Sequence, residues 1–184
     1  NITIDFSLPS ISRYLEKIID FKKPAGQNVK QAIDNKDSSV INYGKHKFVK
    51  DLINLSGTIE EAKKNAYRTK FPKQIEIMLN NFFKLSSRVR KHFPSLSMTV
   101  DITEAKSFLN YENFGFKIYN KENANVIAIG GDYKINNREL GLGVTIMINK
   151  LIESININKQ KRIYIPFNID TKTIPKIIKK NSIL

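Results

Sequence analysis

Side chains that could carry acid–base or metal chemistry are few in this sequence and do not cluster. Four carboxylates fall near the segments expected to form a sheet: Asp101, Glu104, Glu112 and Asp132. Each could serve as a general base, yet no two of them form a recognisable acid–base pair. His46 and His92 lie far apart without acidic neighbours at ligand spacing, and cysteine is absent. We therefore expect no metal site, no disulfide and no cofactor, and these residues alone support no named reaction.

Glycines mark the most distinctive stretch, residues 126–151, which reads as two apolar runs with a polar break. The first run ends in Gly130 and Gly131. A glycine pair at a strand end suggests that another group approaches the backbone closely, because a Cβ would block it; a hairpin with a bulge is the competing interpretation. The Gly141-Leu-Gly143 segment lacks the third glycine and the βαβ context of a dinucleotide-binding fingerprint.

Length and composition set the class of protein. The chain has 184 residues, of which 41% are hydrophobic, and this predicts one domain with at most a small appendage. Its apolar runs are far shorter than the ~20 residues of a membrane span, and its start lacks the features of a signal peptide. Together with the absence of cysteine, this predicts a cytoplasmic protein without a membrane partner. The first residue is not Met, so we expect a fragment or a processed product.

Basic residues outnumber acidic ones, with 31 Lys and Arg against 17 Asp and Glu, for a formal net charge of +14. Such an excess invites a nucleic-acid interpretation. The excess is mostly lysine scattered along the chain, however, and aromatic residues are not interleaved with its denser spots as a stacking platform requires. We therefore expect no nucleic-acid partner, and a basic tRNA-binding module stays open as an alternative.

Helices and strands must position the candidate functional residues. Residues 1–95 are predicted to form a strand followed by a helical block. Pro9 suits the first turn of a helix capped by Ser7. Thr58, with Glu61 three residues later, is a capping box that opens another helix.

The remaining elements belong mostly to a sheet. The longest amphipathic helix should span residues 75–92. Residues 96–157 are predicted to form an antiparallel sheet, because the connections between the strands in 113–146 are short and polar. A helix at 147–155 should close that sheet, and residues 158–184 should add a short strand and a basic helix. The predicted class is α+β.

The order and spacing of the sequence motifs between residues 100 and 151 resemble those in the C-terminal half of the catalytic core of histidyl-tRNA synthetases and their relatives. The family's Arg-Gly-Leu-Asp-Tyr-Tyr segment corresponds to Lys106-Ser-Phe-Leu-Asn-Tyr111, and its Gly-Gly-Arg-Tyr-Asp segment to Gly130-Gly-Asp-Tyr-Lys134. The family also has an arginine seven residues after a glycine, and the same step here runs from Gly143 to Lys150. The resemblance implies a class II aminoacyl-tRNA synthetase-like, mainly antiparallel sheet flanked by helices and preceded by a helical block. It also implies that this is the C-terminal part of a longer domain.

The departures from the family pattern concern its arginines. Lys106 and Lys150 keep the charge without the planar fork that grips phosphate in two places, and Asp132 reverses the sign. The resemblance implies that these three are degenerate phosphate-site positions and that no residue is catalytic. It further implies a vestigial histidine pocket, lined by the surviving matches: Tyr111, Gly130, Gly131 and Tyr133.

One branch of the family fits this loss, the regulatory subunits of ATP phosphoribosyltransferase, which resemble the synthetase core without aminoacylating tRNA. The resemblance implies a non-catalytic subunit that acts with the short catalytic subunit in the first step of histidine biosynthesis and in its feedback control by histidine. A homodimer within a hetero-oligomer is expected. The alternatives are a divergent histidyl-tRNA synthetase and the basic tRNA-binding module.

Overall fold

The computed structural model describes residues 2–41, 46–104, 106–108, 110–136, 139–154 and 170–176. The elements in chain order are β1 (Ile2–Ser7), α1 (Pro9–Ile18), α2 (Pro24–Asn35), the 3-10 turn η1 (Ser38–Val40), α3 (Lys47–Ile53), β2 (Gly57–Thr58), α4 (Ile59–Arg68), α5 (Lys73–His92), β3 (Ser97–Asp101), the 3-10 turn η2 (Lys106–Phe108), β4 (Gly115–Asn120), β5 (Val126–Asn136), β6 (Glu139–Ile146) and α6 (Ile148–Ser154). Two units can be separated, Asn1–Ser154 and Ile155–Leu184. Among the described residues, no helix combines the length and apolar character that a bilayer crossing would need.

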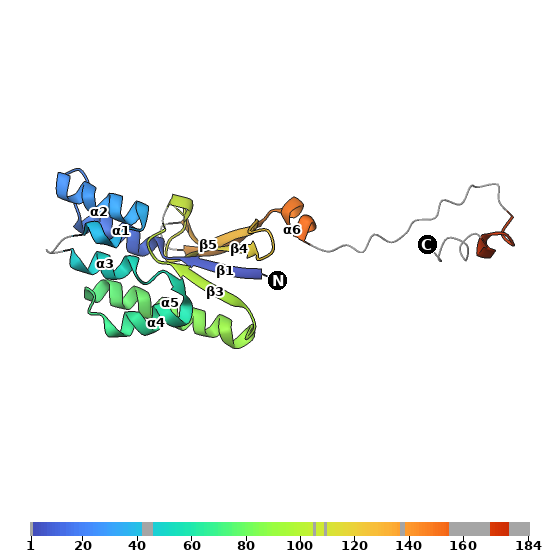
Figure 1. Cartoon of the computed structure of the whole chain (residues 1–184), viewed down its shortest axis with the longest axis horizontal. Coiled ribbons are helices and arrows are strands. Elements are labelled where there is room, and N and C mark those ends of the chain that lie inside the picture. The colour runs from blue at the N-terminus through green and yellow to red at the C-terminus, as the bar shows by residue number, and fades with distance from the viewer. Residues whose placement is uncertain are drawn as a thin grey trace. The chain divides into compact units, whose positions relative to one another are not determined.

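The six strands form one sheet in the order β2-β3-β1-β4-β5-β6. β1 and β3 run parallel, from Thr3 opposite Ser97 to Ser7 opposite Asp101. The other four neighbouring pairs are antiparallel. The chain therefore leaves β1, passes through the helices α1 to α5, and returns beside β1 as β3 (Figure 1). The predicted α+β class with a mainly antiparallel sheet is confirmed.

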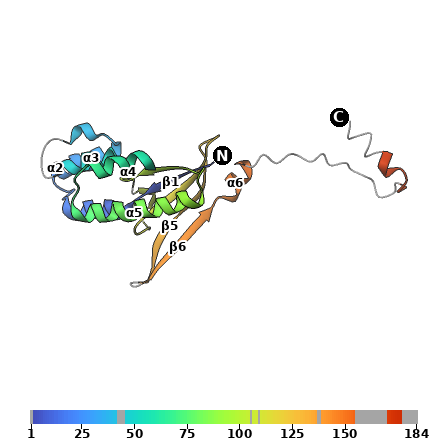
Figure 2. The ribbon, with the colours of Figure 1, turned by 90° about the horizontal axis from the view of Figure 1, so that it is seen from below.

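Apolar side chains of α5 form the centre of the core. Ile75, Leu79 and Phe82 are almost completely buried, at the helical spacing that the sequence predicted. α5 runs along one face of the sheet (Figure 2), where Phe82 meets Phe6 of β1 edge to face with ring centroids 5.5 Å apart. Burying such rings removes large apolar areas from water and stabilises the contact between the helix and the sheet.

Strand alternation gives the sheet two faces, which we name the α5 face and the polar face. Phe6, Met98 and Val100 point to the α5 face and are buried. On β1, β3 and β4, the polar face carries side chains that can bind or exchange protons: Asp5, Thr99, Asp101, Lys117 and Tyr119.

One predicted helix cap is wrong and another is confirmed. Leu8 precedes α1, and no side chain caps that helix. Ser7 is still part of β1, so its hydroxyl instead donates to the carbonyl oxygen of Glu104. Thr58 does cap α4: its Oγ1 accepts the N–H of Glu61 at 3.3 Å and donates to the Glu61 carboxylate at 2.7 Å.

The helix predicted at 147–155 is α6, and its apolar side chains are largely exposed. Ile148 and Ile152 are 58% and 50% exposed, and α6 has no buried residue. The predicted strand at 162–167 lies outside the described residues. In the second unit, residues 170–176 form a turn that enters a helix, and the remainder of the helix predicted there lies outside the described residues.

Candidate functional site

Three glycines stand side by side on the polar face, one on each of β4, β5 and β6. Gly131 of β5 is paired with Gly115 of β4 on one side and with Gly143 of β6 on the other. Paired residues share a face, so these positions leave a strip of backbone without side chains, the glycine floor (Gly115, Gly131, Gly143). A sheet surface of this kind admits a close approach by another group.

Aromatic rings of the chain itself make that close approach. A Cβ on Gly115 would overlap the ring of Phe108, and a Cβ on Gly131 would lie 2.5 Å from Cδ1 of Tyr111. The rings of Phe108 and Tyr111 also contact each other, with centroids 5.8 Å apart. The sequence therefore predicted correctly that other groups approach the glycine pair closely, and at Gly131 that group is Tyr111. The register irregularities of β5 lie elsewhere in the strand, so a bulge does not explain the pair.

Tyr133 lies over the β6 end of the glycine floor and is 38% exposed. A Cβ on Gly143 would lie 3.0 Å from its Cε1. Gly130, in contrast, points to the α5 face, where a Cβ would lie 2.5 Å from Cζ of Phe116. Three of the four predicted pocket residues are thus on the polar face, and Gly130 is on the opposite one.

Arg13 of α1 fixes the loop that carries Tyr111. Its Nη1 donates to the carbonyl oxygen of Tyr111 at 2.7 Å, and its Nη2 donates to that of Glu112. Nη2 also lies 3.5 Å from the Glu112 carboxylate. The guanidinium fork holds two successive carbonyls in one geometry. Sequence reasoning missed Arg13, because no local pattern links α1 to a loop 98 residues later.

Asp132 holds the same loop from the other side. It is 8% exposed, and its Oδ1 accepts the backbone N–H of Asn113 at 2.8 Å and of Phe114 at 2.9 Å. The side-chain amide of Asn113 donates to its other oxygen. Several hydrogen bonds to one ionised carboxylate are the usual way to make a buried charge tolerable. The described contacts of Asp132 are those of a loop anchor, and its assignment to a degenerate phosphate site stays a prediction.

The two lysines of the predicted phosphate site lie on η2 and α6. Lys106 begins η2, and its side chain lies outside the described part of the structure. Lys150 lies on α6, where its Nζ pairs with Glu153 at 3.0 Å, and both side chains are about half exposed. The assignment of both lysines to a degenerate phosphate site stays a prediction.

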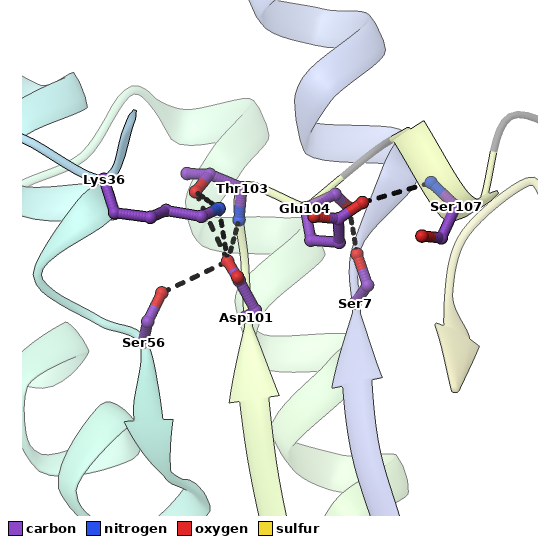
Figure 3. A network of polar contacts seen from close by, with 7 residues as sticks. All are labelled: Ser7, Lys36, Ser56, Asp101, Thr103, Glu104 and Ser107. Atoms are coloured by element: carbon purple, nitrogen blue, oxygen red, sulfur yellow. Dashed lines mark hydrogen bonds and ion pairs between the residues drawn. The ribbon is translucent and has the colours of Figure 1, made fainter. Parts of the chain in front are cut away.

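A second group of polar side chains gathers where the parallel strands β1 and β3 end (Figure 3). Lys36 donates to Asp101 Oδ1 at 2.8 Å and to Thr103 Oγ1 at 2.7 Å. Ser56 donates to the same carboxylate oxygen at 3.3 Å. The carboxylate of Glu104 accepts the backbone N–H of Ser107 at 3.0 Å, so the turn after β3 is well held.

Two titratable side chains on the polar face, Asp5 and Tyr119, have raised pKa values. Burial raises the pKa of Asp5 above its ordinary value of 3.8, although the hydrogen bond from Thr99 opposes the rise. Burial also raises the pKa of Tyr119, and the charges of Asp5 and Glu104 add to the rise. Lys117 partly offsets this field, with its Nζ 2.8 Å from Ser107 Oγ. Carboxylates and aromatic rings thus share this face of the sheet, and such groups attract small cationic or aromatic molecules.

A family model described as histidyl-tRNA synthetase matches residues 1–151. The chain belongs to the histidyl-tRNA synthetase family. Among curated proteins of the family, the ATP phosphoribosyltransferase regulatory subunit of Thermotoga maritima is 26% identical over 141 residues, which cover 73% of this chain and 50% of that protein.

Solved structures of histidyl-tRNA synthetase-like proteins share the fold. The ATP phosphoribosyl transferase (HisG:HisZ) complex from Thermotoga maritima matches with a TM-score of 0.58 at 22% identity, over 79% of this chain and 53% of that one. An ATP phosphoribosyltransferase regulatory subunit/histidyl-tRNA synthetase from Bacillus halodurans C matches with a TM-score of 0.64 at 14% identity, over 85% of this chain and 44% of that one. Histidyl-tRNA synthetase from Nostoc sp. PCC 7120 matches with a TM-score of 0.60 at 14% identity, over 99% of this chain and 50% of that one. The predicted class II synthetase-like fold is confirmed, and the chain spans about half the length of these relatives.

Proposed function

We propose that this chain is a non-catalytic regulatory subunit that acts with the short catalytic subunit of ATP phosphoribosyltransferase in the first step of histidine biosynthesis. The observation that carries the proposal is the use of Asp132. At the position where the resemblance puts a synthetase arginine, this chain has a buried carboxylate engaged by Asn113 and Phe114. A negative group in that position cannot stabilise phosphate charge, which an adenylating enzyme requires. The name of the Thermotoga maritima relative supports the same role.

We further propose that histidine binds on the polar face and provides the feedback signal. Tyr111 and Tyr133 would contact the imidazole over the glycine floor, since both rings already lie against it. Burial raises the pKa of Tyr119 and the charges of Asp5 and Glu104 add to the rise, and an α-ammonium group would be attracted to these negative charges. Tyr133 is partly exposed and is the ring that would turn to admit the ligand. Gly130 would act from the α5 face, by letting β5 and β6 pack closely.

Phosphoribosyl transfer by the short catalytic subunit, measured with and without this chain over a range of histidine concentrations, tests both statements. We expect the chain to raise the rate and to make the activity sensitive to histidine. Tyr111→Phe and Tyr133→Phe should weaken histidine inhibition by about tenfold, the effect of losing one good polar contact. Tyr67→Phe is a matched control, because Tyr67 lies on α4 and is 65% exposed.

Four outcomes would count against the proposal or a part of it. If the chain leaves phosphoribosyl transfer unchanged, the regulatory role is wrong. If both tyrosine variants keep normal inhibition, the regulatory role survives and the pocket assignment fails. Histidine-dependent pyrophosphate exchange by the chain alone would favour a divergent synthetase, whereas steeply salt-dependent tRNA binding without any effect on phosphoribosyl transfer would favour a basic tRNA-binding module.

A further inference from the structure

A hollow separate from the glycine floor opens at the carboxyl ends of the parallel strands β1 and β3. We name it the strand-end pocket; it lies between α1, α2 and the turn that follows β3 and has a volume of about 240 Å³. β1 and β3 run parallel, so their carboxyl ends meet at the same edge of the sheet, and the pocket opens beyond that edge.

The base of the strand-end pocket is apolar. Leu15 of α1 is almost completely buried, and Phe21 and Ile33 pack against the core from the edges of the hollow. Pockets that hold drug-sized molecules have volumes of about 300–1,000 Å³. A volume of about 240 Å³ therefore suits a smaller molecule, with an apolar or aromatic body of a few carbon atoms.

Charges of both signs surround this apolar base. Lys30 and Lys36 bring two ammonium groups, and three carboxylates also line the pocket, those of Glu16, Asp34 and Glu104. Lys30 lies 3.7 Å from Asp34 on the same helix. In a chain with a net charge of +14, a pocket with more carboxylates than ammonium groups does not follow from the general lysine excess.

Lys36 is the residue whose conformation most needs an explanation. It follows α2 with φ +54°, in the left-handed region where glycine is the usual residue at a helix end. Its ammonium donates to Asp101 and Thr103 at the edge of the pocket (Figure 3). An ammonium has three donors, and these contacts use two, so a third can serve an anionic ligand.

We infer that the strand-end pocket binds a free α-amino acid with an apolar or aromatic side chain. The ligand carboxylate would accept from Lys36 and Lys30, its ammonium would donate to Glu16 and Glu104, and its side chain would rest on the apolar base. No residue of the glycine floor, and neither of the rings that cover it (Phe108 and Tyr111), lines the strand-end pocket, so the two proposed sites share only the carboxylate of Glu104.

Isothermal titration of the chain with leucine, phenylalanine and histidine tests the inference. Two probes carry one charge each, 4-methylpentanoate without the ammonium and 3-methylbutylamine without the carboxylate. We expect saturable binding of leucine or phenylalanine, and affinities about tenfold or more lower for both probes, because each lacks one charge-assisted contact. Lys30→Met and Glu16→Gln should each lower the affinity by a similar factor.

Two control variants replace residues outside the strand-end pocket. Lys17→Met removes an exposed lysine of α1 that does not line the strand-end pocket, and it should bind the amino acid normally. Lys30 and Glu16 are exposed, so their variants should fold, and circular dichroism checks this. Tyr133→Phe should also bind normally, which separates this site from the glycine floor.

The inference is overturned by any of three results. One is the absence of saturable binding for all three amino acids at millimolar concentrations. Another is equal binding of an amino acid and of 4-methylpentanoate, which would indicate a simple anion site. The third is loss of binding in Tyr133→Phe with normal binding in Lys30→Met, which would place the ligand on the glycine floor and leave the proposed regulatory role intact.

Discussion

Asp5 carries a carboxylate whose ionised form is destabilised by burial in the folded protein. It stands on the central strand β1, with Lys117 opposite on β4 and Thr99 opposite on β3. Burial raises its pKa, the hydrogen bond from Thr99 lowers it, the negative charges of Asp101 and Glu104 raise it, and Lys117 lowers it. The net direction is upward, so the ionised form of Asp5 destabilises the folded state relative to the unfolded chain.

Replacing Asp5 by Asn should therefore stabilise the protein at neutral pH. A folded-state pKa above the ordinary 3.8 means that the folded protein binds more protons than the unfolded chain in the window above that value. The contribution of Asp5 to the free energy of unfolding therefore falls as pH rises through this window, and Asp5→Asn removes that fall. Urea unfolding of both proteins between about pH 3 and pH 8 measures the difference in their free energies of unfolding. The advantage of the variant should grow with pH and then level off; an advantage independent of pH, or one that shrinks, would contradict the assignment.

At the scale of elements, the glycine floor depends on the exact alignment of three strands. Gly115, Gly131 and Gly143 come together because β4, β5 and β6 pair in one register. A slip by one residue would turn every side chain of a strand to the other face. The floor is therefore a property of the sheet, and the aromatic cover of Phe108 and Tyr111 depends on it.

Gly131→Ala and Gly143→Ala should differ in their effect on stability. A Cβ at Gly131 would lie 2.5 Å from the ring of Tyr111 and also 2.6 Å from the carbonyl oxygen of Phe114, which is backbone and cannot rotate away. We expect a loss of about 1–3 kcal/mol in the free energy of unfolding. At Gly143 the nearest atom belongs to the partly exposed ring of Tyr133, so we expect a change below about 1 kcal/mol. Urea unfolding tests this, and a loss below about 1 kcal/mol in Gly131→Ala would show that the floor is not tightly covered there.

Local patterns in the sequence predicted the elements that depend on local physics. The helical spacing of α5, the cap formed by Thr58 and the antiparallel order of β4, β5 and β6 each follow from residues close together in the chain. The close approach at Gly131 was also predictable, because a glycine in a strand interior has few other reasons to occur.

Contacts between distant segments were not predictable in this way. Insertion of β1 between β3 and β4 joins segments about 95 residues apart, and no local pattern reports it. Arg13 reaches the Tyr111 loop for the same reason, and Gly115 joins the glycine floor only through its register with Gly131. Family resemblance predicts a pocket role for Tyr111 and Tyr133, which stays a prediction, whereas the anchoring role of Asp132 became visible only with its hydrogen-bond partners in place.

At the scale of the whole molecule, charge is unevenly divided between the two units. Ile155–Leu184 contains seven basic residues and one acidic residue, a net charge of +6 within a chain of +14. The sheet, the glycine floor and the strand-end pocket all belong to Asn1–Ser154. The residues that bind ligands in our proposals are thus separate from the most basic part of the sequence.

A chain that ends at Ser154 should therefore keep the stability of the full chain. The core residues on α1, α5 and the strands all precede that point, and α6 at its end buries none of its own side chains. We expect a thermal midpoint within about 3 °C of the full chain, which corresponds to about 1 kcal/mol for a protein of this size. The shorter chain should also bind tRNA less tightly, with a shallower dependence on salt, because it has lost a net charge of +6. Differential scanning calorimetry and filter binding at several salt concentrations measure the two effects. A clearly lower midpoint would mean that Ile155–Leu184 contributes to the fold of the first unit, and the separation of ligand sites from the basic segment would then have to be given up.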